Sequence, residues 1–67
     1  MTLDEFIEEM KNLVQYKDNK HYMGSTVLTN QELNLMLETL LGDEYTKLNY
    51  SQRRRIRQQV FKECSNG

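Results

Sequence analysis

The sequence contains no proline, no tryptophan, one cysteine and one histidine in 67 residues. Because Cys64 is the only cysteine, no disulfide can form within the chain. A metal site is not expected, since His21 stands alone and neither a C-x-x-C nor a His-x-His spacing occurs. The single thiol fits a reducing compartment. We therefore expect a cytoplasmic protein without a metal or other cofactor.

Long apolar runs are also missing. No stretch approaches the roughly 18 consecutive apolar residues of a membrane-spanning helix, and no basic start followed by an apolar segment indicates a signal peptide. The basic part of the chain has few large apolar residues, so binding to a membrane surface is not expected either. A composition of 37% hydrophobic and 28% charged residues is typical of a globular domain.

The length of the chain allows one small domain, which we assign to residues 1–67. A core of this size rarely contributes more than about 3–5 kcal/mol of stability. Without a disulfide or a metal, the fold depends on regular packing or on a partner subunit, so a homodimer is one expectation.

Three stretches have the apolar spacing of amphipathic helices. We predict helices over residues 2–17, 29–41 and 50–64, joined by short connections. The sequence therefore predicts an all-α fold, a small three-helix domain with bundle-like or orthogonal packing.

Capping patterns support the first two helices. Thr2 with Glu5, and Thr29 with Glu32, have the Thr-x-x-Glu spacing of a capping box, in which side chains and backbone N–H groups bond reciprocally. Gly42 follows the second helix where a left-handed closing residue is common. These signals predict two helix starts and one helix end.

The segment between the first two helices, "QYKDNKHYMGSTVL", loses the helical period. The sequence contains no strand-like alternation and no hairpin dipeptide between apolar runs, so no sheet is predicted. Tyr22, Met23 and the pair at residues 27–28 are too apolar for a free linker. We expect a loop that folds back over the core, where a partner could also dock.

Four arginines lie within five positions of the third predicted helix. Residues 49–67 carry five basic and one acidic side chain, against three and five in residues 1–28 and one and four in residues 29–48. On a helix, Arg53 and Arg57 share the side of the apolar residues, whereas Arg54 flanks that side and Arg55 points to solvent. The inward pair either bonds to acids such as Glu38, Asp43 or Glu44, or meets an external anion.

Two function classes remain open. Tyr, Met and Arg are enriched in the centres of protein interfaces, and several tyrosines and one leucine lie outside the predicted apolar stripes. In general character, the small acidic chain resembles the regulators and inhibitors that phages and mobile elements encode. This favours a non-enzymatic module that binds a larger protein. The alternative is a helix-turn-helix-like transcriptional regulator that binds nucleic acid through the arginine-rich helix.

Neither class requires catalysis. A core this small seldom forms a pocket with convergent titratable groups, so we expect no catalytic residues, no cofactor-binding residues and no small-molecule substrate. The residues expected to contact a protein or nucleic acid are Arg53, Arg54, Arg55, Arg57, Gln58, Tyr22, Met23, Leu35, Tyr45 and Tyr50.

Overall fold

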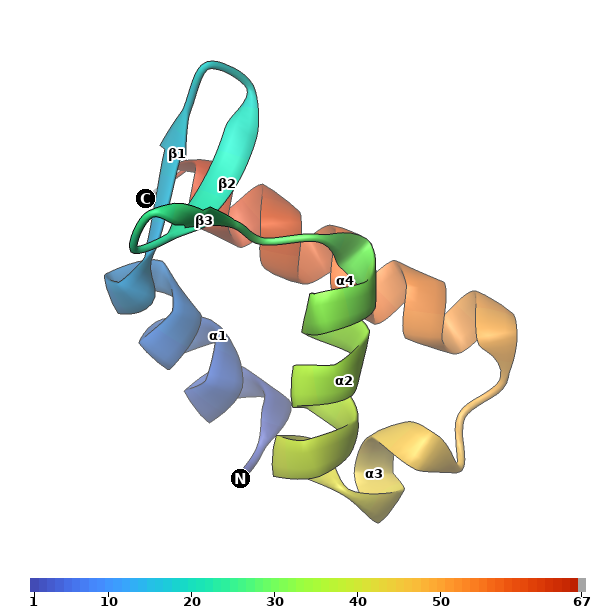
Figure 1. The fold of residues 1–67 in the computed structure, drawn as a ribbon. Helices are drawn as coiled ribbons and strands as arrows, with labels where there is room; N and C mark the ends of the chain where they lie inside the picture. The colour runs from blue at the N-terminus through green and yellow to red at the C-terminus, as the bar shows by residue number, and fades with distance from the viewer. Residues whose placement is uncertain (67) are drawn as a thin grey trace.

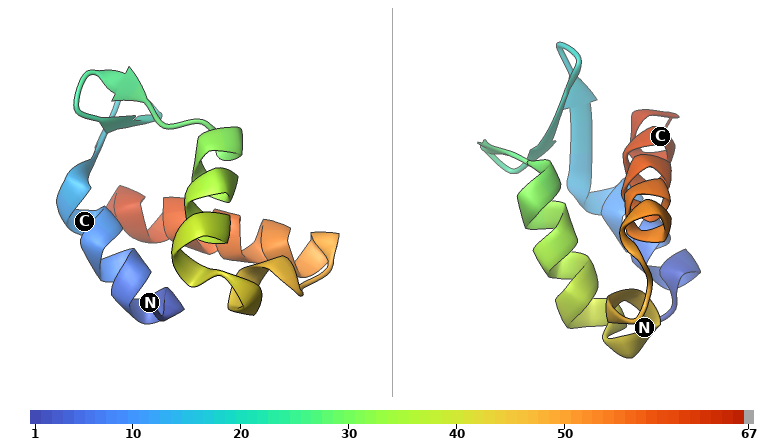
Figure 2. Two further views of the ribbon diagram at one scale, coloured as in Figure 1. Left: turned by 60° about the horizontal axis from the view of Figure 1, so that its bottom comes forward. Right: turned by 90° about the vertical axis from the view of Figure 1, so that its right-hand side faces the viewer.

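The structure, a computed structural model, describes the backbone of residues 1–66 and the side chains of residues 1–65. The elements in chain order are α1 (Leu3–Leu13), β1 (Val14–Lys17), β2 (Lys20–Met23), β3 (Thr26–Val27), α2 (Asn30–Leu41), α3 (Asp43–Thr46) and α4 (Tyr50–Asn66) (Figure 1). The long helix α4 packs against both α1 and α2. The sheet stands at the end of the molecule away from α3 (Figure 2).

The prediction of an all-α, three-helix bundle-like domain is wrong. The segment predicted as a folded-back loop forms a three-stranded antiparallel sheet in the order β1-β2-β3, so the fold is α+β. Residues 14–17 pair with residues 20–23, and Tyr22 and Met23 then pair with Val27 and Thr26.

Two short turns form the sheet. Asp18 and Asn19 connect β1 to β2 with φ angles of 55° and 63°, the left-handed pair that a type I′ hairpin turn requires. Gly24, with φ of 65°, opens the two-residue connection from β2 to β3. Asp and Asn are the residues other than glycine that tolerate this conformation best. The sequence therefore did contain a hairpin signal, in a form without glycine.

The first helix ends at Leu13, four residues before its predicted end. Val14 adopts an extended backbone with φ of −97° and ψ of 132°, yet its side chain remains buried. An apolar residue four positions after Met10 suits the next helical turn and the first position of a strand equally well. The apolar period alone therefore could not locate this helix end.

The predicted capping box at Thr2 is present. The Thr2 backbone N–H donates to a Glu5 carboxylate oxygen at 3.0 Å, and the Glu5 N–H donates to the Thr2 hydroxyl at 3.2 Å. The Thr2 backbone N–H and the Thr2 hydroxyl both donate to the Glu5 carboxylate, and these two bonds lower the pKa of Glu5. At α2, Thr29 accepts from the Glu32 N–H at 3.2 Å; only this half of the second predicted box forms among the described residues.

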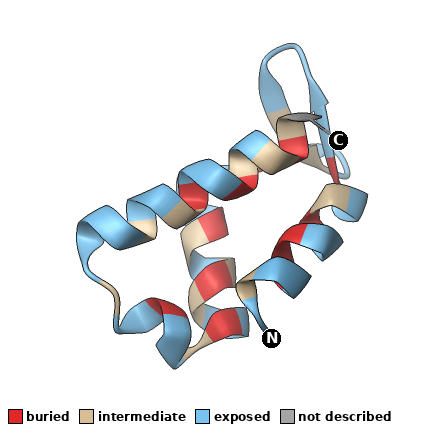
Figure 3. Cartoon of the chain, turned by 180° about the vertical axis from the view of Figure 1, so that it is seen from behind, coloured by how far each residue is buried: buried red, intermediate tan, exposed pale blue. Residues whose placement is uncertain are grey.

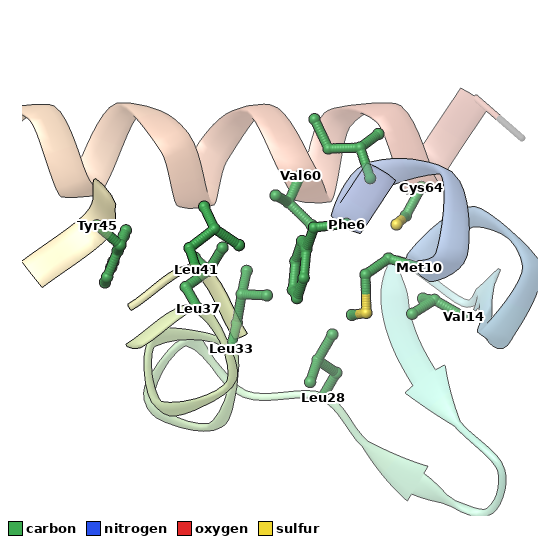
Figure 4. Packing of buried hydrophobic residues seen from close by; sticks show 11 residues of the cluster. Phe6, Met10, Val14, Leu28, Leu33, Leu37, Leu41, Tyr45, Val60 and Cys64 are labelled. Atoms are coloured by element: carbon green, nitrogen blue, oxygen red, sulfur yellow. The ribbon is translucent and has the colours of Figure 1, made fainter. Parts of the chain in front are cut away.

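Side chains from α1, α2, α3, α4, β1 and the segment before α2 meet in one core (Figures 3 and 4). Its buried hydrophobic members are Phe6, Ile7, Met10, Val14, Leu28, Leu33, Leu37, Leu41, Tyr45, Val60 and Cys64. The inward side of α4 supplies only the last two, together with Arg57. The middle of α4 therefore contributes a charged side chain where an apolar one would be expected.

The sheet is attached to the C-terminal end of α4 through His21. Its Nε2 atom lies 3.0 Å from the carbonyl oxygen of Phe61 and 2.8 Å from the hydroxyl of Ser65. The His21 ring also packs between Tyr16 and Phe61, with centroid distances of 4.7 and 4.8 Å. The N-terminal half of α4 is left outside this contact.

Candidate functional site

Asn49 fixes the start of α4. Its side-chain oxygen accepts from the Gln52 N–H at 2.9 Å, and its own N–H donates to the Gln52 side chain at 3.1 Å. This reciprocal pair stabilises the first turn. The following turns carry all four arginines.

The helix divides the arginines as the apolar period predicted. The Arg57 side chain is buried, with 7% of its surface exposed, and Arg53 is half-buried. Arg54 and Arg55 are exposed. The inner and outer pairs therefore lie in different environments.

Arg53 joins α4 to the end of α3. Its Nε donates to the Leu48 carbonyl at 3.0 Å, and its Nη2 donates to the Thr46 carbonyl. Its guanidinium carbon lies 5.6 Å from the centre of the Tyr45 ring, a cation–π distance. Carbonyls at the end of a helix lack intrahelical donors, so a guanidinium satisfies them well.

Arg57 crosses to α2. Its Nε donates to Asn30 Oδ1 at 3.0 Å, and its Nη1 donates to Asn34 Oδ1 at 3.1 Å and to the Tyr45 hydroxyl at 2.8 Å. The Tyr45 hydroxyl in turn donates to Asn34 Oδ1. Asn34 also donates to a Glu38 carboxylate oxygen at 3.2 Å, so this acid is connected to Arg57 only through an amide.

Neutral oxygens therefore hold both inner arginines. The sequence left open an internal ion pair with the acids of residues 38–44, but the structure shows none. Within the described part of the chain, the one ion pair joins Lys11 to Glu8 at 3.8 Å, on α1. The guanidinium of Arg57 is thus a buried positive charge without a carboxylate in contact.

The outer side of the same helix forms a surface that we call the basic ridge, made of Tyr50, Arg54, Arg55 and Gln58. Together with Ser51 these residues line a shallow hollow of about 350 Å³. The Tyr50 side chain is 73% exposed, more than any other large hydrophobic residue that the structure describes. The ridge combines an aromatic ring, two free cations and an amide on one helical face.

A second hollow, of about 480 Å³, lies between α2 and the start of α4. We call it the Arg57 hollow. It is lined by Asn30, Gln31, Asn34, Leu48, Tyr50, Arg53 and Arg57. Both inner arginines contribute to its wall, and Tyr50 lines both this hollow and the one on the basic ridge.

The other residues expected at a contact lie apart. Tyr45 is fully buried, so its ring belongs to the core and only supports the inner arginines. Tyr22 and Met23 are half-buried on β2, at the opposite end of the molecule. Leu35 is 62% exposed on α2 but lines neither hollow. The structure therefore gathers only the residues of α4 into one site.

Sequence reasoning missed the amides of α2 that bind Arg57. Asn30 and Asn34 are one helical turn apart, and Glu38 follows one turn later. This spacing places all three on one face of α2. A polar row beside the apolar stripe was the signal that could have identified them.

No protein-family description matches the chain, and no curated protein or solved structure matches it. Among the described residues, no group of three or more histidine, cysteine, aspartate or glutamate side chains could hold a metal ion. No helix in residues 1–66 has both the length and the apolar character needed to cross a membrane.

Proposed function

We propose that the protein is a small non-enzymatic module that binds a larger protein in the cytoplasm and modulates its activity, as a regulator or inhibitor of the phage or mobile-element type. The observation that carries the proposal is the basic ridge. A tyrosine that is 73% exposed lies there beside two exposed arginines without acidic partners in the described chain.

Tyrosine and arginine are the side chains that most often dominate the binding energy of protein interfaces, together with tryptophan. A tyrosine offers a large contact area at a small cost in conformational entropy, since it has two rotatable bonds. An arginine binds a carboxylate through two parallel hydrogen bonds. The ridge is therefore suited to an acidic surface with a pocket or groove for an aromatic ring.

Nucleic-acid binding is the second candidate. It is favoured by the absence of ion pairs at the four arginines of the described chain and by Gln58, whose amide suits an adenine edge. Two arginines of the four, however, are engaged in internal hydrogen bonds. Affinity for nucleic acid grows with the number of phosphates neutralised. Two free arginines on a chain of pI 5.7 support only weak binding.

A homodimer, the other partner expected from the sequence, would use a different surface. A two-fold interface brings the same patch of both subunits together, so the basic ridge would face an identical row of cations. Leu35, exposed on α2, is the residue most available for such a contact.

The test is charge reversal on the ridge, Arg54→Glu with Arg55→Glu. The matched control is Lys17→Glu with Lys20→Glu, which makes the same charge change on exposed positions beside the hairpin turn. Wild type and both variants are compared in affinity capture from the source cells and in a gel-shift assay with duplex DNA.

We expect the ridge variant to lose the captured protein and the control to retain it. Loss of a DNA shift in the ridge variant alone, with protein capture unchanged, would establish the second candidate. Equal capture by all three proteins would show that the basic ridge does not bind the partner.

A further inference from the structure

We propose that the Arg57 hollow is a binding site for a single oxyanion, a carboxylate or a phosphate. The inference deepens the proposed function, and it rests on that function for the source of the group, which would be an acidic or phosphorylated side chain of the protein partner. The small-anion test given below does not require the partner.

The charge of Arg57 is unbalanced. Burying a charged group is costly unless an opposite charge or several hydrogen bonds compensate. Here Asn30, Asn34 and Tyr45 supply three bonds, but all from neutral oxygens. A bound oxyanion would complete the missing charge pair, because both partners of the new hydrogen bond would then be ionised.

Part of the Arg57 guanidinium group is also left for an external acceptor. Arg57 Nη2 donates no hydrogen bond to the described residues, although Nε and Nη1 do. Every buried side-chain nitrogen and oxygen among these residues has a partner. Nη2 therefore has access to solvent, and the hollow is the one that Arg57 lines.

Further hydrogen-bond donors converge on the same hollow. Arg53 bonds to carbonyls through Nε and Nη2, which leaves its Nη1 for a ligand. Gln31 adds an exposed amide from the first turn of α2. The positive end of that helix favours an anion, as a support to the two guanidinium groups.

The side chains that line the Arg57 hollow also indicate which kind of group presents the anion. Leu48 and the Tyr50 ring give the hollow apolar sides, against which the carbon chain of an acidic side chain can pack. Its volume of about 480 Å³ exceeds what one small ion fills, so there is room for a side chain and ordered water. A group presented from a partner bound on the ridge would reach the hollow past Tyr50.

The experiment is an NMR titration of the full chain with sodium phosphate and, separately, with sodium acetate, at constant ionic strength maintained with chloride. The side-chain Nε–H signals of Arg53 and Arg57 and the amide signals of Gln31 are followed. We expect saturable shifts at these three residues, while the Nε–H signal of Arg55 on the outer face changes little.

Gln31→Glu is the decisive variant, because it places a carboxylate at the rim without altering a buried group. That carboxylate repels the anion and competes for the same guanidinium groups, so affinity should fall by about tenfold or more. Gln59→Glu makes the same chemical change on an exposed position of α4 that lines neither hollow. It should leave affinity within about twofold, since screened distant charges interact weakly.

Arg57→Met should abolish the saturable shifts, with circular dichroism confirming that this variant is folded. Saturation with acetate, alone or with phosphate, supports a carboxylate of the partner as the source, whereas saturation with phosphate alone supports a phosphoryl group. Linear shifts with both anions, or equal affinity in the Gln31→Glu and Gln59→Glu variants, would overturn the site. In that case the proposed function would still be supported if the captured protein is lost in the Arg54→Glu, Arg55→Glu variant.

Discussion

At the scale of single residues, Arg57 is the least expected member of the core. The apolar period of α4 placed it on the inward side, and the structure confirms that position. Its partners could not be predicted, because a guanidinium donates equally well to a carboxylate, an amide or a hydroxyl oxygen. The sequence offered acids in residues 38–44, whereas the fold brings the amides of α2 closer.

We expect Arg57→Met to change the free energy of unfolding by less than about 1 kcal/mol, since replacing buried ionic groups by apolar ones of similar size is often neutral or stabilising. The change removes the uncompensated charge together with its bonds, and the Tyr45 hydroxyl keeps its bond to Asn34. Urea denaturation followed by circular dichroism measures the difference. A loss of more than about 3 kcal/mol would mean that Arg57 stabilises the fold. Anion binding would then not be needed to explain an arginine in the core.

Cys64 provides a second prediction at this scale. Burial in the core raises the pKa of the thiol, with a smaller opposing effect from Lys11. Because the thiolate is the reactive form, folded protein at pH 8 should react with a thiol reagent far more slowly than protein in urea. The rate should rise with pH as the thiol ionises. Equal rates in buffer and in urea would show that Cys64 is not buried.

At the scale of secondary structure, helices were predictable and the sheet was not. The helix spanning 29–41 repeats its apolar residues often enough to define its face, and capping residues mark its start. The strands contain only two to four residues, too few to show an alternation, and three of the four residues of β1 are exposed. Asp18 and Asn19 then make the turn without the glycine that usually reveals it.

The turn can be tested with Asn19→Val. A β-branched side chain at a positive φ is strained, and the left-handed conformation costs about 1–2 kcal/mol per residue, so stability should fall by about that amount. Gln15→Val, on the extended strand β1 opposite Tyr22, is the control and should stay within about 0.5 kcal/mol. Thermal unfolding of both variants measures the effect. Similar stability of the two would contradict the left-handed turn.

At the scale of the whole molecule, charge is distributed unevenly. The sequence predicted a cationic last helix in an otherwise acidic chain, and the structure places its exposed arginines on one side of α4. Their separation from the inner pair followed from the helical period. The Arg57 hollow could not be predicted, because it forms where α2 and Leu48 meet α4, whereas the hollow on the basic ridge is lined by α4 alone.

The exposed apolar side chains bear on the oligomeric state. Large apolar side chains that remain exposed are scattered over α1, the sheet, α2 and α4, so they form no stripe on one element. We therefore expect light scattering to give the mass of one 8.1 kDa chain across a dilution series. A dimer mass that reverts to a monomer in Leu35→Ser would instead support the homodimer through α2.

Photo-crosslinking in the source cells, with benzoylphenylalanine in place of Tyr50, tests most directly whether the N-terminal half of α4 contacts a protein partner. Leu13, 55% exposed on α1, carries the same group as the control. We expect a crosslink to one larger protein from position 50 that is absent from position 13 and is lost when Arg54 and Arg55 are reversed in charge. Crosslinks from position 13 alone, or from position 50 to nucleic acid alone, would contradict the account.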